Sequence, residues 1–300
     1  MPAQIPPQRH RALPALALLA ATAAWGSTFV VAADVIADMS VSAFLTWRFA
    51  IATVVLVAIR PRALARLSRA DLTHGLLLGL ALGAGYILQT YGLKTTPATV
   101  SGFITGMFLV FTPLVAWVTL RRPIPASAWW AVGIATVGLA VISLQGLSIG
   151  VGELLTLGGA LAFACQIVGL SHWSTTQTSY GLAIVQLAVV SVACAVMIPF
   201  EAGPTVPPST KIWVEVLFLA LVATAAAFIV QSWAQAQLEP TRAAIILTGE
   251  PVFAGITGFL VGEEITVRLL IGGALVLLAM YIVELGPRRG SEARVAHLEP

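Results

Sequence analysis

Long apolar runs recur along the whole chain, separated only by short polar or Pro/Gly-containing segments, and they determine the class of fold. A helix of roughly 20 apolar residues is needed to cross a hydrocarbon core about 30 Å thick. Runs of about this length occur ten times, at residues 14–36, 41–59, 72–93, 98–120, 127–144, 153–173, 182–200, 212–236, 241–262 and 267–285. The sequence therefore predicts an all-α membrane protein with ten transmembrane helices.

Charge is too scarce to cover a water-soluble surface. Of the 300 residues, 58% are hydrophobic and only 10% are charged, whereas about a quarter of an ordinary soluble domain is charged. Arg9, His10 and Arg11 precede the first run as they would in a signal peptide, but further spans follow directly, so we expect a retained helix. The basic residues lie in short clusters between apolar runs, which argues against a nucleic-acid partner.

The distribution of Lys and Arg predicts the orientation, because cytoplasmic loops carry an excess of positive charge. With the N-terminus inside, the outer loops hold only Lys94, Lys211 and Arg268. The inner segments then hold twelve basic residues: Arg9, Arg11, Arg60, Arg62, Arg66, Arg69, Arg121, Arg122, Arg242, Arg288, Arg289 and Arg294. We therefore expect a multi-pass protein of the bacterial cytoplasmic membrane, with residues 1–13 and 287–300 as cytoplasmic termini.

The two halves of the chain resemble each other. Residues 86–91, Tyr-Ile-Leu-Gln-Thr-Tyr, recur in kind as residues 228–233, Phe-Ile-Val-Gln-Ser-Trp. An aromatic residue three positions before a polar one also relates residues 25–28 to residues 163–166. Duplication alone is a common origin of large membrane proteins, and that interpretation stays open beside a functional one.

An odd number of spans in each half makes the second half inverted relative to the first. We predict repeats over residues 14–146 and 147–286, each of five helices. Inverted repeats are typical of secondary transporters, in which the two halves expose one central site alternately to each side of the membrane.

Three mid-span glutamines, each three residues after an aromatic side chain, predict a binding site. At this spacing both side chains share one helix face. Amides and rings together suit an amino-acid substrate, so we predict a cavity lined by Trp25, Thr28, Tyr86, Gln89, Phe163, Gln166, Phe228 and Gln231. The alternative is that the glutamines only cross-link neighbouring helices. Gly75, Gly79 and Gly83 repeat at every fourth position, which predicts close helix packing.

Two charges remain deep inside spans, where each is costly without a partner. Glu250 lies near the midplane, and Pro251 beside it predicts a kink. It is either a coupling or substrate-orienting group or a structural acid. Arg48 has three candidate partners: Asp34, Glu250 and the carboxylate of a substrate. We predict that Arg48 forms a structural ion pair with Asp34 or pairs with backbone carbonyls.

Over residues 12–286 the sequence resembles the EamA family of the drug/metabolite transporter superfamily. The resemblance is carried by Trp25-Gly26-Ser27, Trp47-Arg48-Phe49, Arg242-Ala243-Ala244, Glu250-Pro251-Val252-Phe253-Ala254 and Gly262-Glu263-Glu264. Residues 101–106 resemble the branch with the YddG-type aromatic amino-acid exporters. The resemblance implies a ten-helix inner-membrane transporter of inverted repeats. Arg121-Arg122-Pro123 stands where the family often has a second glycine–glutamate pair, so a symmetric role for both glutamates is in doubt.

These observations favour a transporter that exports amino acids, aromatic or other apolar ones among them, by alternating access. No nucleotide-binding glycine loop, metalloprotease motif or nucleophile elbow is present, so we expect neither an enzyme nor a metal or other cofactor. The expected partners are a small-molecule substrate and the lipid bilayer. Proton coupling, facilitated diffusion and the oligomeric state stay open. The alternatives are a broad drug or nucleotide-sugar carrier and a non-transporting membrane sensor or scaffold.

Overall fold

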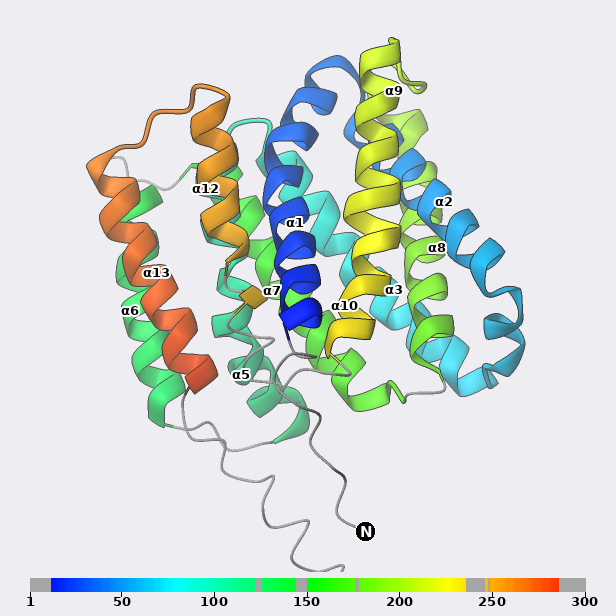
Figure 1. Ribbon diagram of the computed structural model, residues 1–300, viewed down its shortest axis with the longest axis horizontal. Helices are drawn as coiled ribbons and strands as arrows, with labels where there is room; N and C mark the ends of the chain where they lie inside the picture. Colours follow the sequence, from blue (N-terminus) through cyan, green and yellow to red (C-terminus); the bar gives the residue numbers. More distant parts are fainter. Residues whose placement is uncertain are drawn as a thin grey trace, which may run out of the picture.

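The computed structural model describes residues 12–121, 126–143, 150–175, 178–235, 246–247 and 249–285, and within them it contains helices and no strands (Figure 1). The helices, in chain order, are α1 (Ala12–Asp38), α2 (Val41–Ile59), η2 (Pro61–Arg66), α3 (Arg69–Gly92), α4 (Ala98–Thr105), α5 (Met107–Leu120), α6 (Ala126–Ser143), α7 (Val151–Trp173), α8 (Ser179–Met197), η3 (Ile198–Phe200), α9 (Thr210–Leu217), η4 (Phe218–Ala226), α10 (Ala227–Gln235), α12 (Glu250–Leu260) and α13 (Val267–Leu285).

In the described part of the chain, seven helical segments are long and apolar enough to cross a membrane. Two of them are compound, since α4 and α5 continue as Ala98–Leu120 and α9 continues through η4 into α10 as Thr210–Gln231. The predicted spans 127–144, 241–262 and 267–285 coincide with shorter apolar helices, Trp129–Ile142, Glu250–Leu260 and Val267–Ile282. The all-helical membrane class is confirmed, whereas the number ten stays a prediction.

Some of the predicted features lie beyond the described residues. They include most of the N-terminal segment 1–13, the tail 287–300, and the start of the ninth span with Arg242-Ala243-Ala244.

Local sequence explains where several helices begin. The Ser40 hydroxyl accepts a hydrogen bond from the Ala43 amide at the start of α2. At the start of α3, Ser68 and Asp71 bond reciprocally in a capping box. Such side chains satisfy amides that have no partner within the helix.

The glycines repeated along α3 allow close packing against α8, as the sequence predicts. A Cβ atom added to Gly75 would lie 2.7 Å from Val185 Cγ1, and one added to Gly79 would lie 2.6 Å from Val189 Cβ. Gly26 of α1 approaches α12 in the same way, with a hypothetical Cβ 2.8 Å from the Ala254 amide nitrogen. Small residues thus bring helices of the two halves into backbone contact.

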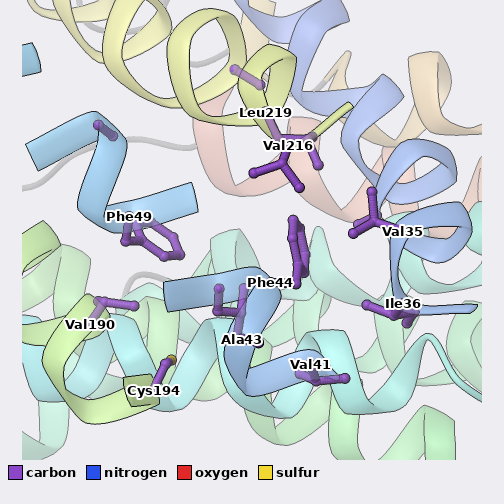
Figure 2. Close-up of a cluster of buried hydrophobic side chains, with 14 of the residues drawn as sticks. Val35, Ile36, Val41, Ala43, Phe44, Phe49, Val190, Cys194, Val216 and Leu219 are labelled. Atoms are coloured by element: carbon purple, nitrogen blue, oxygen red, sulfur yellow. The ribbon is translucent and has the colours of Figure 1, made fainter. Parts of the chain in front are cut away.

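The main apolar core lies among α1, α2, α8, α9 and η4. Figure 2 shows the ring of Phe44 extending from α2 toward Val35 of α1 and Val216 of α9, with Val190 and Cys194 on α8. A smaller cluster joins α5 to α6 and α13, which lie side by side at the left of Figure 1. Large apolar side chains such as Val118 and Leu260 stay exposed, which fits a surface that faces lipid.

Candidate functional site

Four of the predicted site residues form two aromatic pairs, and each pair joins the two halves of the chain. Trp25 of α1 meets Phe228 of α10 edge to face, with ring centroids 6.3 Å apart. Tyr86 of α3 meets Phe163 of α7 in the same geometry at 5.1 Å. This is a favourable arrangement for aromatic rings. The sequence relates Trp25 to Phe163 and Tyr86 to Phe228, so the two contacts are equivalent under the repeat.

Arg48 lies beside these rings and is 3% exposed. Its Nε donates a hydrogen bond of 3.0 Å to Thr224 Oγ1. Its Cζ lies 5.1 Å from the ring centroid of Tyr86 and 5.4 Å from that of Phe49. Rings at this distance attract a cation without neutralising it.

A π-helical segment, η4, supplies the polar groups that meet the first half. The Ala223 carbonyl accepts a 2.8 Å hydrogen bond from the Trp25 indole, and the adjacent Thr224 hydroxyl meets Arg48 and donates to the Leu219 carbonyl. Interruptions of this kind often occur at functional sites. Thr224 is not among the residues predicted from the sequence, although a hydroxyl among four small residues in a span is a signal.

The structure corrects the predicted ion pair between Arg48 and Asp34. Asp34 instead forms a salt bridge with Lys211, which also lies 3.7 Å from Glu215. The Lys211 side chain is 63% exposed, so this pair keeps much of its hydration. Arg48 is buried beside η4, and no carboxylate in the described ranges pairs with it.

Two predicted glutamines each hydrogen-bond a neighbouring helix. Gln89 Nε2 donates to Thr105 Oγ1 at 2.9 Å, which joins α3 to α4. Gln166 Nε2 donates to Gln186 Oε1 at 2.7 Å, which joins α7 to α8. These contacts match the cross-linking alternative. The Thr28 hydroxyl donates to the Trp25 carbonyl in its own helix.

Gln231 is half-buried in α10. The role of these polar residues in lining a cavity stays a prediction.

Glu250 is half-buried at the first residue of α12. Pro251 therefore occupies the first turn of α12, where its missing amide costs no intrahelical hydrogen bond. The predicted kink involves residues outside the described ranges and stays a prediction. The backbone of α12 is close to α1 here, because a Cβ on Gly26 would lie 2.8 Å from the Glu250 carbonyl oxygen. The start of α12, which carries Glu250, thus packs against α1 at Gly26, the residue after Trp25.

Glu263, in the loop after α12, caps a helix of the first half. Its Oε1 and Oε2 accept hydrogen bonds from the Ala98 and Thr99 amides at 2.7 and 2.9 Å. These amides begin α4, whose N-cap residue, Pro97, makes no side-chain cap. A carboxylate is favoured at this end of a helix.

Glu201, after η3, caps α2 in the same way. It accepts hydrogen bonds from the Val41 and Ser42 amides at 3.1 and 2.8 Å and from the Ser42 hydroxyl. Lys94 lies 3.3 Å away. Partial burial acts to raise the pKa of Glu201, but the hydrogen bonds from Ser42 and Val41 outweigh it and lower the pKa to about 2. The side chain is therefore held as a carboxylate.

The chain matches a known protein family over both of its halves. The sequence profile of the EamA-like transporter family matches residues 12–144 and again residues 150–285. An "Uncharacterized transporter" of Archaeoglobus fulgidus is 34% identical over 265 residues, which cover 87% of this chain and 82% of that protein. The "Uncharacterized transporter YoaV" of Bacillus subtilis is 24% identical over 285 residues, or 89% and 95% of the two chains.

The fold also has a relative among solved structures. A protein crystal structure superimposes with a TM-score of 0.61 and 17% identity over 97% of this chain and 100% of that one. The comparisons do not single out the YddG-type branch. Together with the helical membrane fold, the family match over both halves shows that this chain is a membrane transporter and belongs to the EamA-like transporter family.

Proposed function

We propose that the protein exports amino acids across the bacterial cytoplasmic membrane by alternating access between two inverted five-helix repeats. The two family matches divide the chain near the predicted boundary between residues 146 and 147. In this proposal all ten predicted segments cross the membrane, and both termini are cytoplasmic.

Helix packing supports the inverted repeat. α1 packs against α12, and their counterparts in the other half, α7 and the α4–α5 segment, pack against each other. α3 packs against α8, and their counterparts in the other half, η4 and α2, also pack against each other. α6 packs against its own counterpart, α13. A two-fold relation between the halves requires such matched pairs.

The ends of the helices support the orientation. The first turn of α1, the last turn of α13 and the arginine-containing η2 all lie at the lower end of Figure 1. The predicted even number of crossings puts both termini on the same side, and the excess of arginine predicts that this side is cytoplasmic.

The observation that carries the proposal is the convergence of Trp25, Tyr86, Phe163 and Phe228 on the interface between the repeats. In an alternating-access transporter the substrate binds at this interface. Rings from both halves suit an apolar or aromatic amino-acid side chain, and residues 101–106 resemble the branch with YddG-type aromatic amino-acid exporters. Glu250 orients the substrate or carries a coupled proton.

A flux screen tests this function. Purified protein in liposomes is assayed with the twenty labelled amino acids, with and without a pH gradient. We expect flux of aromatic or other apolar amino acids. Stimulation by the gradient supports a coupled proton, and its absence indicates facilitated diffusion. Transport of nucleotide sugars or varied drugs in place of amino acids favours the broad carrier, and absence of any flux favours the sensor or scaffold.

Site variants then test the location. Tyr86→Ala and Phe228→Ala each break one aromatic pair and should lower flux at least about tenfold, a loss of roughly 1.4 kcal/mol in transition-state stabilisation. Trp130→Ala is the matched control, because Trp130 is 73% exposed on α6. Flux that survives combined replacement of Trp25, Gln89 and Gln231 by alanine would refute the predicted cavity.

A further inference from the structure

Arg48 is a buried cation for which the described chain provides no anion. The side chain is 3% exposed, and its hydrogen-bond partner in the described residues is the neutral hydroxyl of Thr224. A guanidinium group has five N–H donors and keeps its charge at any physiological pH. A buried charge without a counterion is strongly unfavourable, especially at membrane depth. We therefore expect an anion to bind beside Arg48.

In the described residues, no carboxylate on the surrounding elements pairs with Arg48. Asp34 and Glu215 lie at Lys211. Glu201 caps α2, and Glu263 caps α4. Glu250, at the start of α12, forms no ion pair with Arg48 within the described ranges.

The fold does not itself require a charge at this position. The sequence separation that relates Trp25 to Phe163 also relates Arg48 of α2 to Gln186 of α8. Gln186 is equally buried, and it is satisfied by neutral groups, since it accepts from Gln166 and donates to the Leu182 carbonyl. The same structural position in the other repeat is thus stable with an amide. A charge that the fold does not need is best explained by a ligand.

We propose that Arg48 binds the carboxylate of the transported substrate, an inference that rests on the proposed function and assigns the chemical group recognised at that site. Thr224 occupies Nε and fixes the plane of the guanidinium, so the two terminal nitrogens form an end-on fork. Such a fork matches the two oxygens of a carboxylate. The ring of Tyr86 lies beside the guanidinium, and the ring of Phe163 packs against Tyr86. In this proposal the two rings contact the apolar part of the substrate.

Four related probes test this recognition: L-phenylalanine, 3-phenylpropionate, phenylalanine methyl ester and phenethylamine. The first two have a carboxylate, and the others have the same ring without one. Dissociation constants come from ligand-dependent thermal stability of the full-length protein in detergent. We expect the carboxylates to bind at least about tenfold more tightly than the ester and the amine.

Variants identify the residue responsible. Arg48→Gln introduces the residue present at the equivalent position of the other repeat, and it should reduce the preference for carboxylates to about one. Arg48→Lys keeps a charge without the fork and should give an intermediate preference. Arg62→Gln removes an exposed arginine of η2 and should leave the preference unchanged.

The outcomes separate this inference from the proposed function. A wild-type protein that binds acid and ester alike, or none of the four probes, overturns the role of Arg48 even if the Arg48 variants fail to fold. A folded Arg48→Gln protein that keeps the preference also overturns it. Arg48-dependent binding of 3-phenylpropionate without any amino-acid flux upholds the carboxylate site and refutes amino-acid export.

Discussion

Removing the Glu263 carboxylate should destabilise the protein by separating α4 from the loop that follows α12. The two carboxylate oxygens accept from the Ala98 and Thr99 amides at 2.7 and 2.9 Å, and Pro97 provides no side-chain acceptor in their place. A hydrogen bond to a charged group contributes about 1.5–3 kcal/mol when buried. These bonds are only partly buried, so water replaces some of the loss, and we expect about 2–3 kcal/mol in total for Glu263→Ala.

The assay is thermal unfolding of the purified protein in detergent. A loss of about 2–3 kcal/mol should lower the melting temperature by roughly 4–12 °C, at about 2–4 °C per kcal/mol for a chain of this size class. Glu263→Gln keeps one acceptor oxygen and should lie between wild type and alanine. Glu264→Ala removes the adjacent, exposed carboxylate and serves as the control. Equal melting temperatures for Glu263→Ala and Glu264→Ala would refute the capping role.

Three further perturbations follow from the packing. The pKa of Glu201 in the folded protein is lowered from 4.5 to about 2, so the carboxylate contributes fully to folding stability above its unfolded pKa, and this contribution is lost as pH falls toward 2. Glu201→Gln should therefore flatten the fall in melting temperature between about pH 5 and 2. An unchanged slope would contradict this. Gly79→Ala overpacks the contact of α3 with Val189 of α8 and should cost about 1–3 kcal/mol. Gly133→Ala, where an added Cβ meets nothing within 4 Å, should be harmless. Equal effects of the two substitutions in unfolding assays would disprove the close approach. A double-mutant cycle of Gln166→Leu and Gln186→Leu should give a coupling energy of about 1 kcal/mol, and independent effects would show that their hydrogen bond contributes nothing.

Local patterns predicted what depends on neighbouring residues, and they failed where the partner is distant. The Ser68–Asp71 capping box is readable because its members are three residues apart. The hydrogen bond from the Ala98 amide to Glu263 joins residues 165 positions apart. From the sequence alone, Glu263 is only an acid that follows one span, and Pro97 is only a proline that precedes another. Asp34 and Arg48 lie at comparable depths in adjacent spans, but Asp34 meets Lys211 of a helix whose position no local pattern gives.

The repeat itself carried more information about the site than any single residue did. Equating residues 25–28 with 163–166, and residues 86–91 with 228–233, used only residue types, yet the equated aromatic residues form equivalent contacts. A two-fold relation between the halves repeats each contact between them at the repeat-related positions, as these two pairs do. Thr224 escaped notice because no polar residue stands at the corresponding part of the first half, and its position depends on the π-helical turn.

The rule that orients the chain also makes the two ends of the molecule chemically unlike. Where α8 ends beside the start of α2, Glu201 accepts hydrogen bonds from the α2 amides. At the opposite junction α2 ends beside the start of α8, and there Arg60 stacks on Tyr180 at 5.1 Å while the Tyr180 hydroxyl donates to the Leu56 carbonyl. An arginine has no acceptor and cannot cap a helix start. In the proposed orientation this second junction is cytoplasmic, and it holds an arginine where the other junction holds a bridging carboxylate. The proposed repeat of the helices therefore does not extend to the chemistry that joins the two halves.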